Sequence, residues 1–130
     1  MKRFFASLVL ILLLFSLVGC SPIMITTNDN AVLKYDNSWK RGHINLTQTL
    51  TAEETRVVKD YLTSAEYTPG EGGCPFSEKV SITFGDQIFA FSQDGCHGIW
   101  IIGTDRYYSL SDEGYDYIVS LFEKYAGEFL

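Results

Sequence analysis

The sequence lacks the short motifs that mark common hydrolases, since G-x-S-x-G, S-x-x-K and H-E-x-x-H are all absent. Histidine is scarce, with 2 copies in 130 residues, and the 10 Lys and Arg are outnumbered by 16 Asp and Glu. The basic residues form no cluster larger than Lys40-Arg41. Because an acidic surface repels phosphate backbones, we expect no nucleic-acid partner. We also expect no catalytic residue, metal or cofactor.

The chain opens with an apolar segment that is too short to span a membrane. Lys2 and Arg3 precede the run from Phe4 to Val18, which is apolar apart from two serines. A membrane-spanning helix needs about 20 such residues, whereas the apolar core of a signal peptide needs fewer. The pattern therefore predicts a signal peptide over residues 1–19.

The residues at the predicted cleavage site are Leu17-Val18-Gly19-Cys20. They resemble the lipobox of bacterial lipoproteins, and the resemblance implies cleavage before Cys20 and a diacylglyceryl group, with palmitate-type chains, on its sulfur. Two acyl chains suffice for stable membrane attachment. The resemblance implies an extracytoplasmic protein anchored to the cell membrane, or to the outer membrane if the source has one. The alternative is a plain secretory signal in which Cys20 falls near the cut by chance.

The rest of the chain divides at about residue 42. Removal of residues 1–19 would take Lys2 and Arg3 with it, so the net charge would change from −6 to −8. Residues 20–42 are weakly patterned and predict a lipid-anchored tether, in which Val32, Leu33 and Tyr35 form a short edge strand. Residues 43–130 remain as a single domain.

Hydrophobic periodicity in this domain predicts strands and two helices. Alternation over 43–50 indicates a strand, and Thr51 with Glu54 forms a capping box for a helix over 52–64. Residues 79–92 predict a hairpin that turns at Gly85-Asp86 and places Ile82 opposite Phe89. Further strands are expected over 99–102 and 107–110, and a last helix after residue 111. We predict an α+β fold, an antiparallel meander of four to five strands with two helices packed on one face.

Two cysteines, Cys74 and Cys96, remain once Cys20 is assigned to lipid. They flank the hairpin, whose ends lie together, so we predict a disulfide in an oxidising compartment. A Cys₂His₂ metal set with His43 and His97 is an alternative, although it lacks paired close spacing. A Cys96–His97 nucleophile and base is another, although adjacent residues on an extended chain point to opposite sides.

Aromatic residues supply the candidate binding surface, formed by Trp100, Tyr107 and Tyr108 with His97 nearby. The strand around Trp100 is apolar on both sides. This pattern fits either a central strand covered on both faces or an exposed patch that binds an envelope protein, a peptide or a glycan.

The expected function is a membrane-anchored, non-catalytic binding or accessory module of the cell envelope. The alternatives are a small enzyme with an unrecognised site near His97 and a purely structural envelope protein. The layout of the domain also resembles small bacterial lipoproteins of uncharacterised function, and that resemblance implies no activity. The residues that carry it are Cys74, Asp94-Gly95-Cys96, Tyr107-Tyr108 and Ser111.

Overall fold

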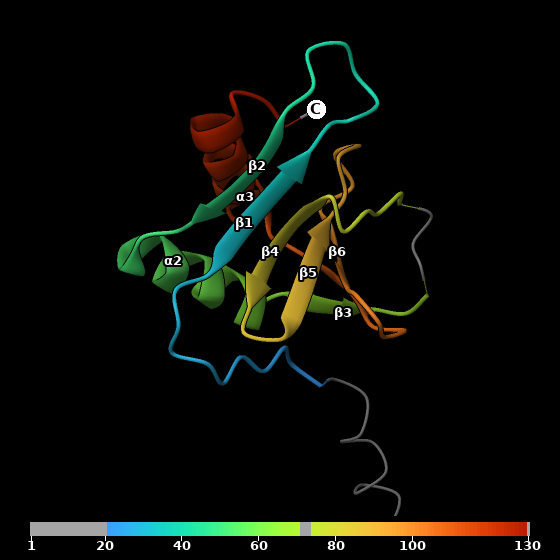
Figure 1. Cartoon of the computed structure of the whole chain (residues 1–130). Coiled ribbons are helices and arrows are strands. Elements are labelled where there is room, and N and C mark those ends of the chain that lie inside the picture. Colours follow the sequence, from blue (N-terminus) through green and yellow to red (C-terminus); the bar gives the residue numbers. More distant parts are fainter. Residues whose placement is uncertain (1–20, 71–73, 130) are drawn as a thin grey trace, which may run out of the picture.

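A seven-stranded antiparallel sheet with two helices forms the domain (Figure 1). The structure is a computed structural model that describes residues 21–70 and 74–129. The predicted signal peptide and Cys20 lie outside the described residues. The elements, in chain order, are β1 (Val32–Asp36), β2 (Asn45–Thr49), α2 (Ala52–Thr63), β3 (Glu66–Thr68), β4 (Val80–Phe84), β5 (Gln87–Phe91), β6 (Gly98–Ile101), β7 (Tyr107–Ser109) and α3 (Asp112–Ala126).

The α+β class, the antiparallel sheet and the two helices are confirmed, but the sheet has more strands than the four to five predicted. Its order is β2-β1-β4-β5-β6-β7-β3. β3 was missed because it has only three residues, of which Glu66 and Tyr67 are exposed, and among the described strands it pairs with β7 alone. Neither helix in the described part of the chain has the length and the apolar character that crossing a bilayer requires.

Each helix begins directly after a capping residue, Thr51 for α2 and Ser111 for α3. The Thr51 hydroxyl accepts from the Glu54 amide at 3.1 Å, and the Glu54 carboxylate accepts from the Thr51 amide at 2.9 Å. Ser111 caps α3 in the same way by accepting from the Gly114 amide at 3.1 Å. These bonds satisfy amides that have no partner inside the first turn of a helix.

One face of the sheet carries the hydrophobic core and the helices. The hairpin register is confirmed, with Ile82 opposite Phe89. Phe122 of α3 packs on this face against Tyr35 and Phe91, with ring centroids 6.0 and 6.2 Å apart. Residues on this face and on the helices form one buried cluster, whose members include Leu33, Val58, Leu62, Val80, Phe89, Ile99, Ile101 and Ile118. None of the described residues forms a helix on the opposite face, which carries Trp100 and Tyr107 and which we call the helix-free face.

The predicted tether over residues 20–42 is wrong for most of its length. Ile23 and Ile25 are buried in the core, with 1% and 8% exposed. β1 is not an edge strand, since it lies between β2 and β4 and pairs with both. The pairing of β1 with β4 joins residues nearly 50 positions apart, which local patterning does not reveal. The polar residues at 26–30 follow the two isoleucines, so the segment has the composition of a loop.

Candidate functional site

Cys74 and Cys96 form a disulfide, as predicted, with their Cα atoms 6.5 Å apart. The bond joins the segment before β4 to the turn after β5, so the ends of the hairpin are covalently closed. Both thiols are consumed, and neither is free to act as a thiolate nucleophile or metal ligand. The donor atoms of Cys74, Asp94 and Cys96 lie within 4.8 Å of one another, and neither histidine of the Cys₂His₂ alternative belongs to this group.

The disulfide holds the segment 74–79 against the helix-free face. Phe76 in this segment lies over Gly98 of β6, where an added Cβ atom would come within 2.9 Å of the Phe76 ring and 3.5 Å of the Cys74 sulfur. Gly98 is buried beneath them. A side chain at this position would make the Phe76 ring shift, so glycine allows the ring to lie this close to the sheet.

Three half-buried rings meet at this point and form a surface that we call the aromatic cluster, made of Phe76, Trp100 and Tyr107. Trp100 and Tyr107 are directly opposite on β6 and β7, and their rings stack 6.1 Å apart at 12°. The Phe76 ring is 6.3 Å from Trp100 and 5.7 Å from Tyr107. The Trp100 ring is held in place because its indole N–H donates to the Thr104 carbonyl at 2.8 Å.

The space around the aromatic cluster is shallow. One cavity of about 260 Å³ is lined by the cluster and Cys74. A second, of about 160 Å³, lies beside it between the disulfide and β7. Pockets for small molecules usually measure about 300–1,000 Å³. The aromatic cluster therefore forms an open surface rather than an enclosed chamber.

The four residues predicted to form the binding surface are split by the sheet. Trp100 and Tyr107 lie together on the helix-free face, but Tyr108 is 1% exposed and packs on the core side, with its ring 5.7 Å from Tyr67. The inclusion of Tyr108 is therefore wrong, because adjacent residues of a strand point to opposite faces. Phe76 was missed, because it lies in a loop without hydrophobic periodicity.

His97 lies on the α3 side of the sheet, away from the aromatic cluster. Its ring stacks on Tyr115 at 4.2 Å, and its Nδ1 atom is 3.2 Å from the Asp112 carboxylate. Its backbone has φ = 55°, which is uncommon for a residue with a side chain. The ring contacts and the bond that its carbonyl accepts from the Leu110 amide at 2.9 Å hold this conformation. His97 lines neither cavity beside the disulfide.

A buried carboxylate, Glu54, connects the two helices. Burial would raise its pKa, but hydrogen bonds from Lys124, the Thr51 amide and Tyr125 outweigh burial and lower the pKa to about 2. Lys124 donates at 2.6 Å and Tyr125 at 2.8 Å. This carboxylate has every bond it needs within the fold, so it stabilises the helix pair rather than serving a reaction.

A second buried group, Tyr35 of β1, ties the sheet to the C-terminal segment. Its hydroxyl donates to Glu128 at 2.8 Å, and burial together with this bond raises the pKa of Tyr35 to about 12.

The chain matches no family model, no curated protein and no solved structure.

Proposed function

We propose that the chain is a bacterial lipoprotein, anchored through Cys20, whose domain is a non-catalytic binding module of the cell envelope. In this proposal the aromatic cluster contacts an extracytoplasmic protein partner. The observation that carries the proposal is the meeting of Phe76, Trp100 and Tyr107 on the helix-free face, under a loop fixed by the disulfide. Aromatic residues are enriched at binding interfaces, where one rigid ring buries a large apolar area at little entropic cost.

Three features of the cluster favour binding. Its rings are half-buried, so each keeps surface to offer while its position is fixed by packing. Trp100 and Tyr107 stand on neighbouring strands, which are more rigid supports than loops. The disulfide reduces the freedom of the loop that carries Phe76, so less entropy is lost when a partner binds.

The two rival functions would depend on other features of the structure. An enzyme near His97 would use the imidazole with the Asp112 carboxylate, 3.2 Å away, for acid–base work. Asp112 is, however, 93% exposed, so water surrounds one side of the pair. A purely structural protein would have no reason to keep an aromatic cluster accessible on a face without helices.

Crosslinking in intact cells tests the proposal. A photoreactive amino acid replaces Tyr107, and a second strain carries it at Lys34, which is exposed on the same face of the sheet. We expect a reproducible protein adduct from position 107, its loss in a Trp100→Ala variant, and its persistence in a Trp39→Ala variant, which removes an exposed Trp outside the cluster. Equal adducts from positions 107 and 34, or none from either, would contradict the proposal.

A further inference from the structure

Ser21 is bound to the rest of the domain through its backbone carbonyl. The Ser21 carbonyl accepts a hydrogen bond from the Tyr108 hydroxyl at 2.9 Å and another from the Arg106 guanidinium at 3.2 Å. Arg106 also donates to the Tyr108 hydroxyl. The three groups are therefore hydrogen-bonded to one another. Tyr108 is 1% exposed, so its packing in the core holds this arrangement in place.

The next residues continue this attachment. Ile23 is 1% exposed and Ile25 is 8% exposed, so the chain is packed into the domain directly after Ser21. Consecutive Cα atoms are about 3.8 Å apart. The residue that precedes Ser21 is Cys20, and the domain therefore leaves no length of free chain between itself and the proposed lipid.

The surface around Ser21 has the chemistry of a membrane-interface contact. Three large hydrophobic side chains remain exposed in the described part of the chain, and two of them, Met24 at 67% and Tyr67 at 43%, belong to this end. Tyr67 and Ser21 line a common cavity of about 420 Å³. Tyrosine favours the headgroup level of a bilayer, and the Arg106 guanidinium suits a lipid phosphate.

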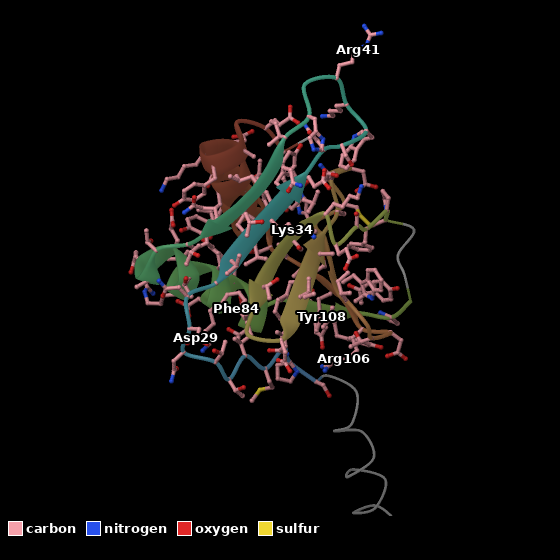
Figure 2. All side chains as sticks on the ribbon, in the orientation of Figure 1. Asp29, Lys34, Arg41, Phe84, Arg106 and Tyr108 are labelled. Atoms are coloured by element: carbon pink, nitrogen blue, oxygen red, sulfur yellow. A yellow bond between two sulfur atoms is a disulfide. The ribbon has the colours of Figure 1, made fainter. Side chains whose placement is uncertain are left out.

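The opposite end of the molecule carries the loop 37–44. Figure 2 labels Arg41 at the tip of this loop and Arg106 at the other end of the domain, where the described chain begins. The third exposed large hydrophobic residue, Trp39, is 54% exposed in this loop. A domain held at Ser21 would therefore present loop 37–44 away from the lipid.

We propose that the end formed by Ser21, Met24, Tyr67 and Arg106 rests on the bilayer surface, so that the anchor holds the domain in one orientation with loop 37–44 outward. The inference rests on the proposed lipid attachment at Cys20. It replaces the flexible tether that the sequence predicts with a direct contact. The net charge of −8 on the mature chain repels anionic headgroups, so the contact is tested on zwitterionic lipid.

The experiment uses the lipidated full chain in phosphatidylcholine vesicles whose acyl chains are brominated near the headgroup. In a Trp39→Phe parent, Met24→Trp reports on the proposed contact and Arg41→Trp on the opposite end. The parent alone corrects for Trp100. We expect the brominated lipid to quench the emission of Met24→Trp and to leave the emission of Arg41→Trp unchanged. Equal quenching of the two variants would overturn the inference.

A matched control inserts ten Gly and Ser residues between Cys20 and Ser21, a flexible span of about 17 Å. The domain is unchanged, and we expect the quenching of Met24→Trp to fall. The mass of the lipidated chain separates the two proposals. A chain without acyl groups refutes both, whereas an acylated chain with unquenched Met24→Trp refutes only the orientation.

Discussion

Gly98 lies directly beneath the Phe76 ring of the aromatic cluster. A methyl group there would come within 2.9 Å of the Phe76 ring, which would have to move. We expect Gly98→Ala to lower the free energy of unfolding by about 1–3 kcal/mol, as overpacking of a filled site does. Urea denaturation measures the change. In a Phe76→Ala background the same substitution should cost less, and strictly additive losses would show that the two residues do not meet.

Glu54 gives the fold a dependence on acid. Its pKa is about 2 in the folded protein against 4.5 ordinarily, so its stabilisation is complete above about pH 4.5 and is lost as the pH falls toward 2. We expect Glu54→Gln to reduce the free energy of unfolding at pH 7 by about 1–3 kcal/mol and to flatten the acid limb of the profile. Denaturation from pH 7 to pH 2 measures both.

The neighbouring Glu53→Gln variant is the control for this prediction, because Glu53 is exposed and its ion pair is with Arg56 on the same helix. It should change little at either pH. An unchanged acid limb in Glu54→Gln would mean that the carboxylate does not stabilise the helix pair.

Individual site residues could be predicted only as far as local patterning reaches. The pairing of Cys74 with Cys96 followed from the hairpin, since the strand ends must meet. The period of two also separates Tyr107 from Tyr108, so the mistaken placement of Tyr108 was avoidable. Phe76 was not predictable in position, because it lies in an aperiodic loop whose path depends on the disulfide and on the missing side chain at Gly98.

At the scale of elements, the segment 74–79 is held on the sheet chiefly by the disulfide. The bond closes a loop of 22 residues, and the chain-entropy model assigns such a loop about 3 kcal/mol. We expect the Cys74→Ala, Cys96→Ala double variant to lose about 3 kcal/mol of the free energy of unfolding, as measured by urea denaturation. We also expect Trp100 emission to shift as the Phe76 ring moves away from the Trp100 ring. Unchanged stability and emission would show that the loop is fixed by packing alone.

The helices and the β4–β5 hairpin were predictable because their signals are local. Thr51 and Ser111 mark helix starts within four residues of the groups they cap, and the hairpin register follows from one turn. β1 and β3 differ, since β1 pairs with β4 and β3 pairs with β7, partners that lie far along the chain. Their positions depend on burial of the whole sheet, which no window of sequence contains.

In the whole molecule, the two ends of the domain differ in the side chains that they expose. One end holds Ser21 by hydrogen bonds and exposes Met24 and Tyr67, and the other carries the loop with Arg41. The aromatic cluster lies on the helix-free face. In the proposed orientation, lipid would contact the end of the domain at Ser21, and the proposed binding surface would stay accessible.

The proposed lipid attachment at Cys20, the residue before Ser21, can be tested by intact-mass spectrometry of the native, membrane-extracted protein. We expect a chain that begins at Cys20, carries a diacylglyceryl group and is two hydrogens lighter than its reduced form. A chain that begins elsewhere, or a Cys20 without acyl groups, would refute the attachment.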